Sequence, residues 1–259
     1  MKLGVFDSGL GGLTIVKTML ENLHGADIVY IADTKNAPYG EKGPEEIIDF
    51  STKITQYFID EFHIDALVIA CNTATSAAIA KLRDKFKDLI IIGTEPGLKP
   101  AIMSSKTKKV GILATPATLN GQKYKDLVKE LGNQYNVKIY ENACAGLVQQ
   151  IENGELDTPK TISMLDDWLK VMREDGVDTI VLGCTHYPLV GESIKKVMQK
   201  DVKLVETSHA ITKRVDELCN NVLKCENKNS LKIFATGKIS KSMIEMILGK
   251  KYEVEMITI

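Results

Sequence analysis

Short aliphatic runs alternate along the chain with longer segments in which apolar residues recur at helical spacing. Residues 2–6 (KLGVF), 65–70 (DALVIA) and 178–183 (DTIVLG) are mostly apolar and short, as is typical of strands buried on both faces of a sheet. Residues 44–62 and 73–86 have helical periodicity instead. The first of these helical segments begins with Pro and two Glu, which helix N-termini favour. This alternation predicts parallel sheets covered by helices.

The same criteria predict further elements through the rest of the chain. The expected strands are 27–33, 89–94, 109–115, 137–143, 202–207 and 231–236, with an edge strand in 252–259, and the expected helices are 13–23, 117–131, 158–175, 191–200, 210–223 and a short one near 240–248.

Two pairs of segments resemble one another. Residues 2–13 (KLGVFDSGLGGL) resemble 109–119 (KVGILATPATL), and 65–73 (DALVIACNT) resemble 178–186 (DTIVLGCTH). The members of each pair occur in the same order and at nearly the same spacing. The repeat predicts two copies of one α/β unit.

The repeat also predicts the domain boundaries. We expect a first α/β domain of residues 1–95 with Cys71 and a second of 96–207 with Cys184. Residues 208–259 are too few for a third copy and are assigned to the first domain, whose sheet they would complete. The expected fold class is α/β, with two pseudo-symmetric parallel-sheet domains facing each other across the active-site cleft.

A cysteine follows each of two equivalent aliphatic runs, and short polar residues follow both cysteines: Cys71 and Cys184. Ligands of open parallel sheets bind beyond the carboxyl ends of the strands. If the carboxyl edges of two related domains face each other, the two thiols approach one small molecule from opposite sides. That arrangement suits chemistry on both faces of one carbon. Other residues expected at strand ends are Asp7, Ser8, Asp33, Thr94 and Thr115.

The residues around the two thiols suit proton transfer. Each cysteine precedes a predicted helix or turn, where free N–H groups favour a thiolate and can bind a carboxylate. Asp7 is expected beside the strand that carries Cys71, and His186 follows Cys184 by two residues. A single cysteine at a strand end is more often a small buried hydrophobe, and that alternative stays open. The other three cysteines have no repeated counterpart and are predicted to be structural or incidental: Cys144, Cys219 and Cys225.

Composition excludes several functional classes. The chain has 259 residues, 44% of them hydrophobic, which is enough for one large or two small cores. The formal net charge of −1 favours neither nucleic acid nor a membrane surface as a partner. The N-terminus does not resemble a secretory signal and no apolar run would span a bilayer, so a cytoplasmic location is expected. The 5 cysteines include no CxxC pair, and we expect no disulfide framework and no metal site.

Four motifs then identify a family. DSGLGGLT (7–14), PYG (38–40), ACNTAT (70–75) and LGCTHYPL (182–189) resemble, in order and spacing, the glutamate racemases of the cofactor-independent aspartate/glutamate racemase superfamily. The resemblance covers essentially the whole chain. It implies interconversion of L- and D-glutamate without a cofactor, supply of D-glutamate for peptidoglycan, and a homodimer.

The resemblance also implies roles for individual residues. Cys71 and Cys184 resemble the two acid/base thiols, with Cys184 as the base and Cys71 as the acid in the L-to-D direction. Asp7 and His186 resemble their supporting groups, and Glu152 resembles an acidic residue near the second thiol. The predicted substrate-binding residues are Asp7, Ser8, Pro38, Tyr39, Gly40, Cys71, Asn72, Thr73, Thr115, Thr118, Thr185 and His186, with Tyr39 and Gly40 acting mainly through backbone N–H groups.

Two stretches depart from the family pattern. Lys35 and Asn36 stand in the loop before PYG, where an Arg is usual, and ATGK (235–238) stands where a TTGD-like stretch is common. Three alternatives remain besides glutamate racemase. They are a racemase of aspartate or another small acidic amino acid, a glutamate-binding protein, and a Cys–His hydrolase, which would need one cysteine and a covalent intermediate.

Overall fold

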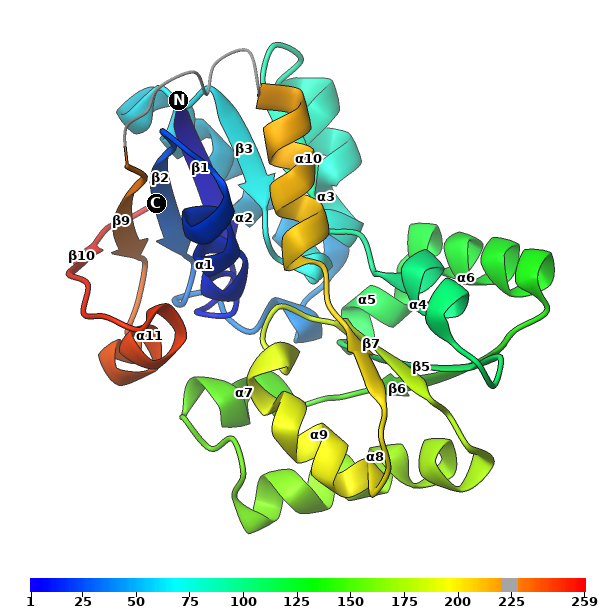
Figure 1. Ribbon diagram of the computed structural model, residues 1–259. Helices are drawn as coiled ribbons and strands as arrows, with labels where there is room; N and C mark the ends of the chain where they lie inside the picture. Colours follow the sequence, from blue (N-terminus) through cyan, green and yellow to red (C-terminus); the bar gives the residue numbers. More distant parts are fainter. Residues whose placement is uncertain (220–227) are drawn as a thin grey trace. The chain divides into compact units, whose positions relative to one another are not determined.

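The computed structural model describes residues 1–219 and 228–259, and it confirms the α/β class. The chain forms two compact units. Unit 1 comprises Met1–Glu95 and Thr207–Ile259, and unit 2 comprises Pro96–Glu206. Each unit contains one parallel sheet with helices on both faces (Figure 1). Among the described residues, no helix combines the length and apolar character that crossing a membrane requires.

The sheet of unit 1 has six parallel strands in the order β10-β9-β2-β1-β3-β4. Its central strands are buried on both faces, as their continuous apolar sequences predict. The C-terminal segment contributes two strands, and the expected edge strand is the short β10. The strand bounds are β1 Lys2–Asp7, β2 Asp27–Ala32, β3 Ala66–Ile69, β4 Ile90–Gly93, β9 Ser230–Ala235 and β10 Val254–Met256.

Helices cover both faces of this sheet (Figure 1). α1 packs with α10 and α11, and α2 packs with α3. The prediction of a single helix over 44–62 is corrected by the structure. α2 ends at Tyr57, and a π-helical turn, Phe58–Phe62, follows it. Phe62 in this turn packs on Phe234, with the two ring centroids 5.0 Å apart. The helix bounds are α1 Leu13–Asn22, α2 Pro44–Tyr57, α3 Asn72–Lys85, α10 Ser208–Cys219 and α11 Lys241–Leu248.

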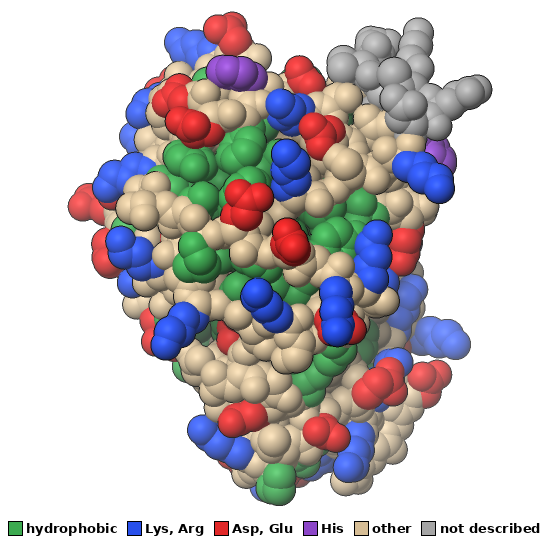
Figure 2. Space-filling view, turned by 90° about the vertical axis from the view of Figure 1, so that its left-hand side faces the viewer, with side chains coloured by type: hydrophobic (Ala, Val, Ile, Leu, Met, Phe, Trp, Pro, Cys, Tyr) green, Lys and Arg blue, Asp and Glu red, His purple; other side chains and the backbone are tan. Residues whose placement is uncertain are grey.

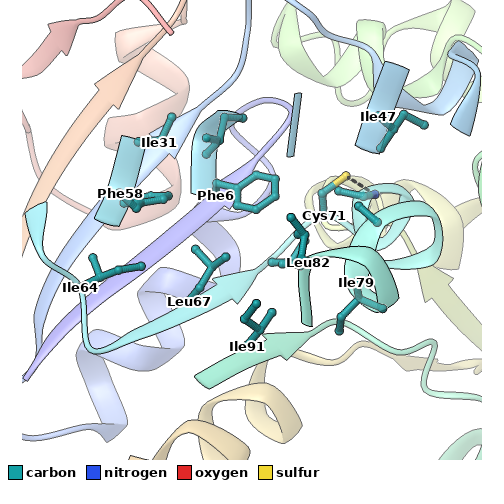
Figure 3. Packing of buried hydrophobic residues seen from close by; sticks show 14 of the residues in the cluster. Phe6, Ile31, Ile47, Phe58, Ile64, Leu67, Cys71, Ile79, Leu82 and Ile91 are labelled. Carbon is teal, nitrogen blue, oxygen red and sulfur yellow. Dashed lines mark hydrogen bonds between the residues drawn. The ribbon is translucent and has the colours of Figure 1, made fainter. Parts of the chain in front are cut away.

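A continuous hydrophobic cluster lies between the sheet of unit 1 and α2 and α3 (Figure 3). Phe6, Leu67 and Leu82 are completely buried within it. Cys71 belongs to the same cluster. Removal of this apolar surface from water is the main force that stabilises the end of β3, which carries Cys71.

The sheet of unit 2 has four parallel strands in the order β6-β5-β7-β8. This order matches β2-β1-β3-β4 of unit 1, so the sequence repeat corresponds to a repeated strand topology. β9 and β10 extend only the first sheet. The strand bounds of unit 2 are β5 Lys109–Ala114, β6 Lys138–Ala143, β7 Thr179–Gly183 and β8 Lys203–Val205.

The helices of unit 2 differ from expectation at two places. The helix expected over 117–131 is divided into α5 and α6 at Gly121, whose extended backbone (φ −64°, ψ 133°) ends one helix and starts the next. Two short helices, α4 and α7, were not predicted because each is shorter than two full helical periods. The helix bounds are α4 Leu98–Ser104, α5 Pro116–Asn120, α6 Gln122–Tyr135, α7 Leu147–Glu152, α8 Pro159–Asp175 and α9 Gly191–Met198.

Charged side chains of both signs are mixed on the surface shown in Figure 2. Lys and Arg lie among Asp and Glu, and hydrophobic side chains are exposed between them. This mixture agrees with the formal net charge of −1 and is ordinary for a protein surface.

Candidate active site

Cys71 lies at the junction of β3 and α3, where it is the N-cap residue of the helix. Its Sγ accepts a hydrogen bond from the backbone N–H of Ala74 at 3.4 Å, drawn as a dashed line in Figure 3. Only 5% of the residue is exposed. A thiol in this position faces the positive end of the helix dipole, which favours negative charge.

Hydrogen bonds hold the strand end that carries Cys71. The Thr94 hydroxyl is 2.8 Å from the carbonyl oxygens of both Ile69 and Ala70. The N–H of Ala70 donates to the carbonyl of Phe6 at 2.9 Å. The backbone on either side of β3's end is therefore paired, and the thiol is carried on a rigid support.

A buried carboxylate lies close to this thiol. β1 pairs with β3, as predicted, and places Asp7 and Ser8 at the same sheet edge as Cys71. The Ser8 hydroxyl donates to Asp7 Oδ1 at 3.2 Å, and Cys71 Sγ lies 3.8 Å from Ser8 Oγ. Asp7 is completely buried. A Cβ on Gly12 would approach the Asp7 Cβ to 2.8 Å, so this glycine permits the close packing of the turn on Asp7.

Asn72 and Thr73 form the first turn of α3 and are both buried. The side-chain nitrogen Nδ2 of Asn72 has no hydrogen-bond partner among the described residues. A buried amide donor without a partner is costly, so a ligand that accepts its hydrogen bond would relieve that cost. Asp7, Ser8, Cys71, Asn72 and Thr73 are called the Cys71 cluster below.

Pro38, Tyr39 and Gly40 lie in the loop that follows β2. Tyr39 and Gly40 are buried and begin a short 3₁₀ turn, Tyr39–Glu41. The Tyr39 hydroxyl donates to Asp33 Oδ2 at 2.5 Å.

Tyr39 is also electrostatically coupled to the Cys71 cluster. Burial raises the pKa of Tyr39 most, the negative charge of Asp33 and the hydrogen bond to it raise this pKa further, and Cys71 and Asp7 add to the rise. Tyr39 therefore stays neutral and keeps its donor proton. Sequence reasoning placed Asp33 at a strand end but gave it no role. The sequence feature that could have indicated a role for Asp33 is the turn D-T-K-N (33–36), because an Asp at the start of a turn commonly accepts a hydrogen bond from a residue further along.

Cys184 follows β7 in unit 2 and is 7% exposed. Its Sγ lies 3.7 Å from Nδ1 of His186. Nε2 of His186 lies 2.7 Å from Glu152 Oε1, although Glu152 is 34 residues earlier in the chain and belongs to α7. Thr185 Oγ1 lies 3.4 Å from the same Nδ1. Glu152, Cys184, Thr185 and His186 are called the Cys184 cluster below.

His186 favours its protonated form. Burial opposes the charge, but hydrogen bonds to Cys184 and Glu152, and then their negative charges, raise the pKa of His186 well above 6.5. An imidazolium donates from both ring nitrogens, so it can stabilise a Cys184 thiolate and a Glu152 carboxylate together.

Tyr187 and Cys144 lie near Cys184. Tyr187 is completely buried, and its hydroxyl donates to the carbonyl of Cys144 at 3.4 Å. Burial, followed by negative charge at Cys184, raises the pKa of both Tyr187 and Cys144, so both stay protonated. Cys144 is thus a neutral thiol near the Cys184 cluster. Cys219 is buried at the end of α10, and Cys225 lies outside the described residues.

Thr115 is the N-cap residue of α5 in unit 2, and Thr118 lies within the helix. The N–H of Thr118 donates to Thr115 Oγ1 at 3.3 Å, and the two hydroxyl oxygens lie 2.9 Å apart. Thr115 follows Ala114, which pairs with Gly183. Thr115 and Cys184 therefore share one sheet edge.

The described residues contain no group of three or more His, Cys, Asp or Glu placed to hold a metal ion.

Comparison with known proteins adds a family to this geometry. Residues 3–215 match the family model described as Asp/Glu/Hydantoin racemase. Glutamate racemase of Sulfurovum sp. (strain NBC37-1) is 55% identical over 96% of this chain and 94% of its own length. The fold is similar to that of glutamate racemase isoform RacE1 from Bacillus anthracis, with a TM-score of 0.85 and 31% identity. The match covers 99% of this chain and 97% of that protein. The fold is equally similar to glutamate racemase from Francisella tularensis subsp. tularensis SCHU S4 in complex with D-glutamate, with a TM-score of 0.85, 29% identity and the same coverage.

Proposed function

The chain belongs to the Asp/Glu/hydantoin racemase family, and we propose that Cys71 and Cys184 are the two acid/base groups with which it interconverts L- and D-glutamate. One observation carries the proposal: both cysteines are buried thiols just beyond equivalent strands of two sheets with the same strand order. Chemistry on both faces of one carbon needs two such groups, whereas a hydrolase needs one nucleophile.

The proposed reaction is a proton exchange at the α-carbon. The Cys184 thiolate removes the α-proton of L-glutamate and becomes a thiol. The Cys71 thiol donates its proton to the opposite face and becomes a thiolate. The roles reverse from D to L, so the number of protons on enzyme and substrate is conserved. No organic cofactor takes part in these steps.

Each thiol has its own proton-handling partners in this mechanism. On the Cys184 side, the His186 imidazolium stabilises the thiolate that begins the L-to-D reaction. On the Cys71 side, the helix N-terminus and the Ala74 N–H that donates to Sγ stabilise the thiolate that begins the D-to-L reaction. Positioned proton transfer of this kind is typically worth about 10²–10⁴-fold in rate.

We assign substrate binding to polar groups at the carboxyl edges of the two sheets. The positive end of the α3 dipole and the unpartnered side-chain nitrogen of Asn72 suit a substrate carboxylate. The remaining proposed contacts are Asp7, Ser8, Pro38, Tyr39, Gly40, Thr73, Thr115, Thr118, Thr185 and His186. Supply of D-glutamate for peptidoglycan and a homodimer stay predictions from the resemblance, and a cytoplasmic location stays a prediction from the sequence.

The test is proton NMR of L-glutamate in D₂O with wild type, Cys71→Ser and Cys184→Ser, with circular dichroism recorded alongside. We expect wild type to racemise glutamate and exchange its α-proton without added cofactor, and each variant to lose racemisation. Residual exchange of one enantiomer by a variant would identify the thiol that serves it. Exchange of aspartate instead of glutamate would indicate a related racemase, and exchange of neither would favour a binding protein.

A further inference from the structure

Asp33 holds together parts of unit 1 that are far apart in sequence. It directly follows β2 and is 1% exposed. Its carboxylate accepts hydrogen bonds from Asn36 Nδ2 at 3.0 and 3.1 Å, from the Tyr39 hydroxyl at 2.5 Å and from the Thr236 hydroxyl at 2.7 Å. A buried carboxylate is stable only with such donors, so these three side chains are held in one arrangement.

The third donor comes from the turn after β9. β9 lies beside β2 in the sheet, with Ala235 opposite Ala32 (Figure 1). The Thr236 hydroxyl also accepts from the backbone N–H of Lys35 at 3.1 Å. It therefore connects the Asp33 carboxylate to the backbone of the loop that leads to Tyr39.

Gly237 completes this contact. Its N–H donates to the Thr34 hydroxyl at 2.9 Å. A Cβ at Gly237 would lie 2.9 Å from the nitrogen and 3.1 Å from the Cα of Lys35. Both of these atoms belong to backbone, so a side chain at residue 237 would displace the loop.

We propose that the turn Thr236–Gly237 is a positioning element for substrate binding, which holds Tyr39 and Gly40 through Asp33. The inference rests on the proposed function, in which the Tyr39–Gly40 loop contacts glutamate. Thr236 and Gly237 do not touch the substrate. They act by setting where the backbone N–H groups of the loop lie. The C-terminal segment thereby helps to position a binding loop that comes from the N-terminal part of unit 1.

A misplaced loop should weaken binding more than it slows proton transfer. The loop contacts would be made to the substrate throughout the reaction, and loss of such uniform binding raises KM while kcat changes little. Thr236→Val retains the shape of the side chain and removes both hydrogen bonds of the hydroxyl. We expect KM for both enantiomers to rise about tenfold, since a hydrogen bond to a charged group is lost. We expect kcat to change by less than about threefold.

The experiment compares Thr236→Val with Thr236→Ser and with Thr212→Val. Thr236→Ser retains the hydroxyl and should restore KM. Thr212 lies in α10 and donates to the Ser208 carbonyl at 2.8 Å, so Thr212→Val controls for loss of a buried hydroxyl elsewhere in unit 1. Racemisation is followed in both directions by circular dichroism, D-glutamate binding by calorimetry, and amide hydrogen exchange over residues 34–43 by mass spectrometry.

Faster exchange over residues 34–43 together with a raised KM in Thr236→Val, both reversed in Thr236→Ser, supports the proposal. Gly237→Ala is a second variant that should displace the same loop if Thr236→Val folds poorly. Wild-type KM and binding in folded Thr236→Val or Gly237→Ala would overturn the inference, as would an equal loss in Thr212→Val. Absence of racemisation in wild type would instead overturn the proposed function.

Discussion

The Cys71 and Cys184 clusters have the same backbone origin and different chemistry. Both thiols follow a buried parallel strand, and the two strands occupy the same place in their sheet orders. Beside Cys71 stand a hydroxyl and a buried carboxylate, Ser8 and Asp7. Beside Cys184 stands the His186 imidazole, which is paired with a carboxylate that helps to raise the pKa of the imidazole.

The strand registers show where the repeat diverged. Phe6 pairs with Ile69 in unit 1 as Leu113 pairs with Leu182 in unit 2. Asp7 therefore corresponds to Ala114, and by the same alignment of the cysteines Thr73 corresponds to His186. The comparison teaches that the repeated topology specifies where a thiol lies, while a few neighbouring side chains specify how it handles a proton.

The largest expected effect separates the two cluster thiols from their neighbour Cys144. We expect Cys184→Ser and Cys71→Ser each to lower racemisation at least about 10³-fold, because a serine hydroxyl is a far weaker acid than a thiol and does not ionise near neutral pH to supply a base. Cys144→Ser is the matched control, since Cys144 is buried and neutral, and should retain most activity. Circular dichroism measures the rates. Equal losses in all three variants would mean that the Cys184 effect comes from packing.

The second prediction tests the division of labour between the clusters. We expect Asp7→Asn to slow α-proton exchange of D-glutamate more than that of L-glutamate, because Asp7 lies beside the thiol proposed to act on the D enantiomer. His186→Asn should show the opposite preference. Each loss should be about 10²-fold for the affected enantiomer. Initial deuterium incorporation into each enantiomer, measured by NMR, gives the ratios, and identical ratios in both variants would contradict the division.

The third prediction concerns the pH dependence of the Cys184 cluster. Glu152 helps to raise the pKa of His186, so Glu152→Gln should lower it and move the alkaline loss of kcat to lower pH. In the wild type the raised pKa adds folding stability that is complete below about pH 6.5 and is lost as pH rises through the pKa of the folded state. The variant should have less of this stability and lose it at lower pH.

Thermal unfolding midpoints and kcat measured from pH 6 to 10 would check the Glu152→Gln prediction. Glu192→Gln is the control, since Glu192 is exposed and forms its ion pair with Lys195, away from His186. An alkaline limb that stays in place in Glu152→Gln would show that Glu152 does not act through His186.

The smallest expected effect concerns the two residues that follow the thiols, Asn72 and Thr185. Asn72→Ala should raise KM by about tenfold, because the proposed substrate contact is lost. It should leave the unfolding temperature nearly unchanged, since Asn72 Nδ2 makes no hydrogen bond to the described protein. Thr185→Ala should instead change the pH profile, because Thr185 Oγ1 lies beside His186. A stable Asn72→Ala variant with unchanged KM would remove Asn72 from the substrate site.

Much of the backbone was predictable because strand burial and helix spacing are local properties of sequence. The strands that carry both thiols and most helices agree with their predicted ranges. The errors fall where local pattern is ambiguous. Gly121 interrupts a periodic segment, and Phe58–Phe62 continues a helix with a wider turn. Neither change alters the apolar periodicity over a long enough window to be detected.

The sequence by itself determined that two cysteines end equivalent buried strands and that short polar residues follow them. Only the tertiary structure decided which distant side chains form hydrogen bonds with the polar residues of the site. Glu152 reaches His186 across 34 residues, and Thr236 reaches Asp33 across 203. Periodicity reports which residues are buried, because burial follows from a helix or strand repeat. Which buried polar groups become hydrogen-bond partners depends on how loops close and sheets pack. These pairings form only in the folded chain, where each buried donor and acceptor needs a partner.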